Sequence, residues 1–118
     1  LTDCLLMGDM NAHSPFDASW TDEHLENYAV ISTFMAASLH DICYMFTADA
    51  QRYSYPTRIL VSSPKGEALR RQQERIDFIF VTDSLRPNCV DAEIYNGSDT
   101  DYLSDHYPVG ISMFIPKE

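Results

Sequence analysis

One stretch of sequence constrains the fold more than any other. Residues 75–81 read Arg-Ile-Asp-Phe-Ile-Phe-Val, a nearly unbroken apolar run. A short run of β-branched and aromatic residues predicts a strand whose two faces are both buried. Its one carboxylate, Asp77, needs a partner, because an isolated buried charge is costly. Arg75, two residues earlier on the same face, is one candidate partner, and a histidine from elsewhere in the chain is the other.

Further elements are predicted on both sides of this strand. A continuous apolar run over residues 2–7 predicts a second, fully buried strand that ends at Gly8. Apolar residues spaced three and four apart predict an amphipathic helix from Thr21 to about His40, with its apolar stripe in the core. Shorter strands are expected at residues 53–55, 89–95 and 108–115, with a turn at 62–66 and a polar loop at 67–73.

This order of elements, a strand, a helix and then several closely spaced strands, indicates the fold class. It favours an α/β domain of the α+β kind, with one mixed, mostly antiparallel sheet and a layer of helix. A length of 118 residues leaves room for one domain. With helix on one face only, the other apolar face of the sheet would be bare, so we expect it to need a second layer.

Charge and cysteine content limit the partners and the compartment. The net charge of −10 argues against non-specific binding of duplex DNA by bulk charge. Basic residues gather in residues 52–86, where we expect a solvated basic loop, with anion binding by its arginines as the alternative. Three widely spaced cysteines form no disulfide framework or zinc motif and favour an intracellular compartment. No run is long and apolar enough to predict a transmembrane segment.

Polar residues interrupt the predicted strand ends in three places. Asp9 and Asn11 follow the first strand, where a carboxylate can activate water and a carboxamide can bind a phosphate oxygen. The alternative there is a turn in which both residues bond their own backbone. Asp77 interrupts the central strand. Asp105 and His106 precede the last strand and suit a metal ligand and an imidazole catalyst, although either alone is more often an ordinary loop residue.

Taken in order, residues 5–11, 75–80 and 104–109 resemble the endonuclease/exonuclease/phosphatase superfamily of metal-dependent phosphodiesterases. Residues 39–41 and 53–56 are similar to the helix end and the aromatic strand that lie between these motifs in that family. The resemblance implies the C-terminal half of a four-layer α/β/β/α sandwich, so that the chain would be a partial domain whose N-terminal half is absent. It also implies hydrolysis of phosphoester bonds by metal-assisted attack of an activated water.

The resemblance implies a role for each matching residue. Asp9 would orient or deprotonate the attacking water and help to hold the metal, and Asn11 would hold a phosphate oxygen. His106 would stabilise the charged transition state, while Asp77 would fix the tautomer of His106. Asp105 would help to hold Mg²⁺ or Mn²⁺, since these metals prefer hard oxygen ligands.

Substrate identity stays open. Tyr55 and His13 are further candidates for substrate binding, whereas His24 and His40 are assigned to a helix surface and a helix end. By position, residues 53–73 form the expected specificity loop, and the substrate is a small phosphoester, a lipid headgroup or a nucleic acid. We expect the complete domain to be an enzyme and this chain alone to be inactive, because the principal metal-binding Glu would lie in the absent half. The alternative is a catalytically incomplete fragment or a non-enzymatic binding remnant.

Overall fold

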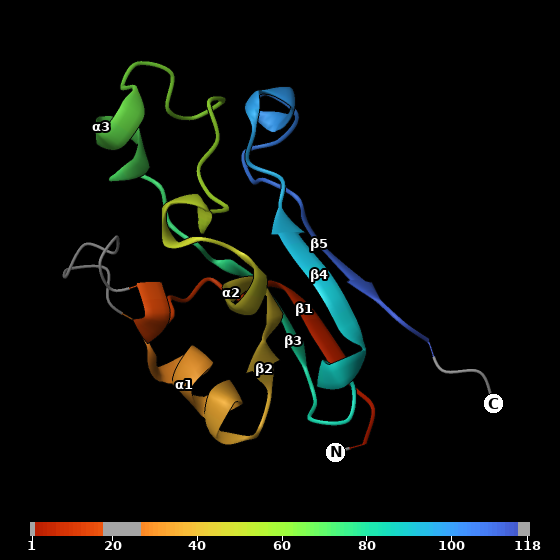
Figure 1. Ribbon diagram of the computed structural model, residues 1–118. Helices are drawn as coiled ribbons and strands as arrows, with labels where there is room; N and C mark the ends of the chain where they lie inside the picture. Colours follow the sequence, from red (N-terminus) through yellow and green to blue (C-terminus); the bar gives the residue numbers. More distant parts are fainter. Residues whose placement is uncertain (1, 18–26, 116–118) are drawn as a thin grey trace.

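The computed structural model describes residues 2–17 and 27–115. Five strands form two sheets (Figure 1), and every strand pairing among the described residues is antiparallel. The first sheet has the order β1-β3-β2, and the second is a β4–β5 hairpin. The strands are β1 (Leu5–Asp9), β2 (His40–Asp41), β3 (Asp77–Val81), β4 (Cys89–Ile94) and β5 (Val109–Met113). The predicted α+β class, with antiparallel pairing, is confirmed.

In residues 2–17 and 27–115, three short α-helices lie among these strands: α1 (Ala29–Ala36), α2 (Ile42–Phe46) and α3 (Gly66–Arg70). The predicted helix was too long at its C-terminal end, since α1 stops at Ala36. Ser38 takes a left-handed φ of 63°, and the N–H of Leu39 donates to the carbonyl of Phe34, which closes the helix. The predicted start at Thr21 lies outside the described residues. None of the described helices has the length and apolar character needed to cross a membrane.

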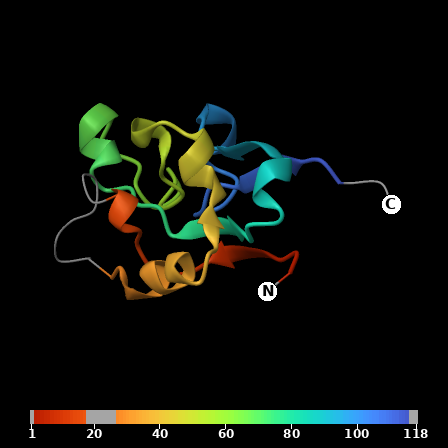
Figure 2. The same cartoon turned by 60° about the horizontal axis from the view of Figure 1, so that its bottom comes forward.

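β3 is the centre of the core, and its predicted burial on both faces is confirmed. Phe78 and Phe80 point to one face, where Ile31 of α1 packs against them. Ile79 and Val81 point to the opposite face and pack against α2 and the β4–β5 hairpin. Figure 2 shows α1 on one side of the three strands and the hairpin on the other. The molecule therefore has a helix layer, a three-stranded sheet and a hairpin layer.

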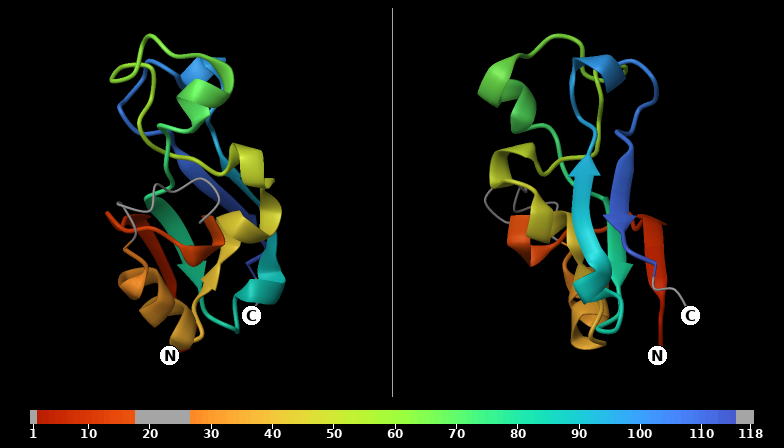
Figure 3. Two further views of the ribbon diagram at one scale, coloured as in Figure 1. Left: turned by 90° about the vertical axis from the view of Figure 1, so that its left-hand side faces the viewer. Right: turned by 45° about the vertical axis from the view of Figure 1, so that its right-hand side comes forward.

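β1 differs from the prediction of a fully buried strand. Leu5 and Met7 are 38% and 50% exposed, while Leu6 between them packs into the cluster beneath α1. The reason is position, because β1 is the edge strand of its sheet. The hairpin packs beside β3 (Figure 3), so the face of β1 on that side is only partly covered by the described residues.

The prediction of a single mixed sheet was also wrong, because β4 and β5 form a sheet separate from that of β1, β3 and β2. After β3 the chain turns through a 3₁₀ turn at Arg86–Asn88, and the hairpin stacks over the Ile79 face of β3. Apolar patterns along the sequence predict each strand, but they do not say which strands share hydrogen bonds.

Residues 53–73 contain less strand and more helix than predicted. The expected strand at 53–55 is reduced to one isolated bridge between Tyr55 and Glu74. The expected polar loop contains α3, and residues 58–60 form a turn. α2 was not predicted, although its N-cap has a recognisable sequence signal: the carboxylate of Asp41 accepts the N–H of Tyr44 at 3.3 Å.

The prediction of a solvated basic loop is wrong for three of its arginines. Arg52, Arg70 and Arg75 are all buried, at 6%, 8% and 1% exposure. The Nε of Arg75 lies 2.8 Å from Oδ2 of Asp17, and its two terminal nitrogens each lie 2.7 Å from an oxygen of Asp41. Arg75 therefore links the loop after β1, β2 and the start of β3.

Candidate active site

Asp9 and Asp77 lie directly opposite each other on neighbouring strands, because the β1–β3 register pairs them. The Asp77 side chain is 13% exposed and the Asp9 side chain is 47% exposed. Like charges at opposed positions repel each other. A positively charged group between the two carboxylates would offset this repulsion.

His106 supplies an imidazole at this position. Its Nδ1 lies 2.8 Å from Oδ2 of Asp77, and its Nε2 lies 4.0 Å from Oδ2 of Asp9. One ligand atom from each of the three residues lies within 4.8 Å of the others. Of the two candidate partners of Asp77, the histidine is the one that bonds it. Arg75 is bound instead to Asp17 and Asp41.

The carboxylates change the acidity of this imidazole. Partial burial lowers the pKa of His106, but the hydrogen bond to Asp77 and the charges of Asp77, Asp105 and Asp9 outweigh it. The net pKa of His106 is raised above its ordinary value of 6.5. The protonated imidazole is therefore favoured over a wider pH range than in a free histidine.

Backbone geometry orients Asp9. Gly8 has a φ of 141°, a region that only glycine enters readily, and Asn11 has a φ of 47°. The N–H of Asn11 donates to Oδ1 of Asp9 at 2.7 Å. The turn predicted as the alternative is thus present, because the Asp9 side chain bonds the backbone N–H of Asn11. It engages Oδ1 of Asp9, while Oδ2 is the oxygen on the side of His106.

The remaining predicted site residues lie at varying distances from this centre. The Tyr55 ring packs against the His106 ring, with 4.6 Å between centroids. Asp105 is exposed and adds to the field at His106, but it is outside the group of three ligand atoms. His13 is buried, and its Nε2 lies 2.9 Å from Oε2 of Glu74.

The other two histidines were predicted to have no catalytic role. His40 lies in β2 rather than at a helix end, and its Nε2 contacts the carboxylate of Asp83. His24 lies outside the described residues. His40 and Asp83 thus form a third imidazole–carboxylate pair, after His106–Asp77 and His13–Glu74, near Val81 at the opposite end of β3 from Asp77.

The donor set fits part of a Mg²⁺ or Mn²⁺ site. Mg²⁺ is commonly held by one or two protein carboxylates, with water and substrate phosphate as its other ligands. Asp9 meets this description, because its side chain is half-exposed and faces a second carboxylate. His106 fits less well, since its Nδ1 already bonds Asp77 and hard cations prefer oxygen to nitrogen.

Two residues that the sequence did not single out, Ser54 and Thr57, support the site. Both side chains are fully buried. Ser54 Oγ accepts the backbone N–H of Asp77 at 3.2 Å, and the N–H of Thr57 donates to the carbonyl of Asp105 at 3.1 Å. For Ser54 the available signal is its place between two tyrosines in a segment expected to be a strand, whereas Thr57, between Pro56 and Arg58, has no such signal.

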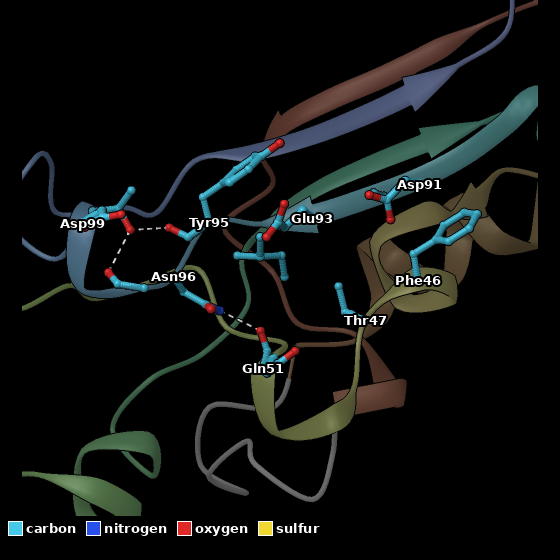
Figure 4. Close-up of a pocket in the computed structure, with 12 residues that line it drawn as sticks. Phe46, Thr47, Gln51, Asp91, Glu93, Tyr95, Asn96 and Asp99 are labelled. Carbon is cyan, nitrogen blue, oxygen red and sulfur yellow. Dashed lines mark hydrogen bonds between the residues drawn. The ribbon is translucent and has the colours of Figure 1, made fainter.

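A cavity of about 520 Å³ lies elsewhere, between β4 and the segment that follows α2 (Figure 4). Its lining includes the acidic side chains of Asp91, Glu93 and Asp99, and Asn96 closes one side by donating to the carbonyl of Gln51. Asp9, Asp77 and His106 do not line this cavity. The three-residue centre and the cavity are thus separate features.

No protein-family model matches the chain, and no curated protein matches it. The chemical interpretation of the site therefore depends on its geometry. What that geometry offers is an oriented imidazole, two opposed carboxylates and an aromatic ring at one end of β3.

Proposed function

We propose that this chain is the C-terminal half of a metal-dependent phosphoester hydrolase of the endonuclease/exonuclease/phosphatase type. The observation that carries the proposal is the imidazole of His106 between the carboxylates of Asp77 and Asp9. The order of the three motifs along the chain supports the same assignment. An imidazole that is fixed by one carboxylate and faces a second one is suited to phosphoryl chemistry, where charge and protons both move.

Each residue has a role consistent with its contacts. His106 donates its Nδ1–H to Asp77, so its Nε2 remains to stabilise charge on the phosphoryl oxygens. Asp77 holds the imidazole in this tautomer and orientation. Asp9 orients or deprotonates the attacking water through Oδ2, because its Oδ1 accepts the N–H of Asn11. The side-chain amide of Asn11 holds a phosphate oxygen.

Asp9 and Asp105 are the proposed ligands for Mg²⁺ or Mn²⁺. When bound, the metal would polarise the phosphoryl group and offset its negative charge. Asp105 is exposed and its charge acts on His106, which supports a position close to the reacting groups. Tyr55 offers its ring to the substrate beside His106. His13 is the weakest substrate-binding candidate, since it is buried and bonded to Glu74.

A four-layer sandwich is the proposed complete fold, with the absent half covering this one. Exposed Leu5 and Met7 on β1 support a further layer, because adjacent large apolar side chains favour burial. We propose that the chain alone is inactive, since the half-exposed Asp9 and the exposed Asp105 do not make a complete metal site. The alternative, a binding remnant without activity, is supported by the same incompleteness.

The acidic balance of the chain bears on the substrate. Duplex DNA binding relies on clusters of exposed basic side chains, and Arg52, Arg70 and Arg75 are buried. We therefore favour a small phosphoester or a lipid headgroup as the substrate.

Hydrolysis of bis(p-nitrophenyl) phosphate by the complete domain, with Mg²⁺ and with a chelator, tests the proposal. We expect Mg²⁺-dependent turnover that falls at least about a hundredfold in Asp9→Ala and in His106→Ala. His40→Ala is the matched control, because it removes an imidazole bonded to a carboxylate away from the site. Full activity in both site variants would overturn the site assignment, and a complete domain without turnover would favour the binding remnant.

A further inference from the structure

Ser54 joins the strand that carries Asp77 to the segment that carries His106. Its side chain is fully buried, and its Oγ accepts the backbone N–H groups of Ile76 at 3.1 Å and Asp77 at 3.2 Å. Its backbone carbonyl accepts the N–H of Tyr107 at 2.8 Å. One buried serine therefore contacts the backbone of Asp77 and the residue that follows His106.

Thr57 makes a second connection three residues later. Its side chain is also fully buried, and its Oγ1 donates to the carbonyl of Ser104. Its N–H donates to the carbonyl of Asp105 at 3.1 Å. Between these two hydroxyl residues, the ring of Tyr55 packs on the ring of His106. Residues 54–57 therefore run along residues 104–107 and hold them at both ends.

These contacts matter because the Asp77–His106 bond joins two segments that are far apart in sequence. A buried backbone N–H needs an acceptor, which in a regular sheet is a carbonyl of the neighbouring strand. At Asp77 a side-chain oxygen from Ser54 also accepts, and it ties the start of β3 to the same residue that binds Tyr107. Small displacements of either segment would lengthen the imidazole–carboxylate bond, and such bonds weaken quickly with distance and angle.

We propose that Ser54 and Thr57 are positioning residues that hold the imidazole of His106 against the carboxylate of Asp77. Under the proposed function the His106–Asp77 pair is part of the catalytic site, so the inference rests on that function. The bond joins two residues of this chain, which allows a test that does not depend on turnover. Ser54 acts at the carboxylate end of the bond, and Thr57 acts at the imidazole end.

The test is NMR of the 118-residue chain without metal, with the downfield Nδ1–H signal of His106 as the readout. We expect Ser54→Ala and Thr57→Val to lose this signal. The amide of Asp77 should also exchange about tenfold faster in Ser54→Ala, because it loses an acceptor. Ser54→Thr keeps the hydroxyl and should retain the signal.

Ser14→Ala is the matched control, because Ser14 is also fully buried and its Oγ also accepts a backbone N–H, that of Phe16. This variant should keep the His106 signal. If Ser54→Ala does not fold, the His106 signal in Thr57→Val tests the proposal. An unchanged signal in the folded variants would overturn the proposal. Unfolding of both variants, with Ser14→Ala folded, would overturn it too, because the hydroxyls would then serve general stability. Neither result depends on the hydrolysis assay.

Discussion

Both terminal nitrogens of Arg75 lie 2.7 Å from the carboxylate oxygens of Asp41, a bidentate pair between β2 and the start of β3. The Nε of Arg75 binds Asp17 as well, and the Arg75 side chain is fully buried. Burial lowers the pKa of Arg75, but the two carboxylates outweigh it, and the net pKa is raised. The guanidinium therefore remains charged, and the three residues form one buried ionic unit.

Arg75→Met should destabilise the chain by about 3–5 kcal/mol, because it leaves Asp41 and Asp17 buried without this partner. Arg71→Met is the control, since Arg71 pairs with Glu67 at 3.4 Å in an exposed position. The control should cost only about 0–1 kcal/mol. Urea unfolding followed by circular dichroism measures both values. Equal losses in the two variants would contradict the buried unit.

Asp77→Asn should lower the pKa of His106, because the nearest of the carboxylates that raise it becomes neutral. The ring protons of His106 report this in an NMR titration, and Asp83→Asn, at the separate His40–Asp83 pair, should leave the titration of His106 unchanged. A pKa of His106 that stays in place in Asp77→Asn would show that the observed bond does not control its acidity.

The same pair makes stability depend on pH. A folded-state pKa above the unfolded value of 6.5 means that folding favours the protonated imidazole. The stabilisation from this pair is therefore complete below pH 6.5, and it is lost as pH rises through the raised folded pKa of His106. Unfolding free energies of the native chain and Asp77→Asn should differ most below pH 6.5 and converge in alkaline buffer.

Gly8→Ala should destabilise the chain by about 1–3 kcal/mol, because a φ of 141° strains any residue with a Cβ. No atom lies within 4 Å of the position that this Cβ would take, so the cost comes from the backbone alone. Gly97→Ala is the control, since Gly97 also has open space around it but a φ of −97°. Thermal unfolding should separate the two variants, and similar melting temperatures would contradict the strained geometry.

Met7→Lys should reduce binding of the apolar dye ANS and self-association, because it places a charge on the uncovered face of β1 beside Leu5. Val90→Lys is the control, since Val90 is equally exposed at 50% but lies at a bulge in β4. Dye fluorescence and sedimentation velocity measure the effect. If both variants reduce dye binding equally, the β1 face is not the main apolar surface.

The strands of the core could be predicted because apolar residues dominate β3 and recur along β4 and β5. β3 and the β4–β5 hairpin lie within two residues of their expected ends. The burial of Arg75 could not be predicted in this way, because its partners Asp17 and Asp41 lie 58 and 34 positions away in sequence. Charged side chains are ordinarily solvated, and only tertiary contacts reverse that expectation.

The candidate site shows the same division. Asp9, Asp77 and His106 were chosen from motifs, but their approach depends on the β1–β3 register and on the path of residues 104–107. Neither can be read from local patterns. The contribution of Ser54 was missed for a similar reason, since a buried serine has no distinctive periodicity and its acceptor role appears only when β3 lies beside it.

The burial of three arginines also affects the electrostatic interaction between the chain and an anion in solution. Among the described residues, Arg52, Arg70 and Arg75 are buried, whereas nine of the fourteen acidic side chains are exposed. The electrostatic field at the surface therefore repels a negatively charged phosphoester. Dissolved salt screens such a field. Encounter with a negatively charged molecule should then accelerate as ionic strength rises, opposite to the behaviour of proteins that use surface lysines and arginines to attract polyanions.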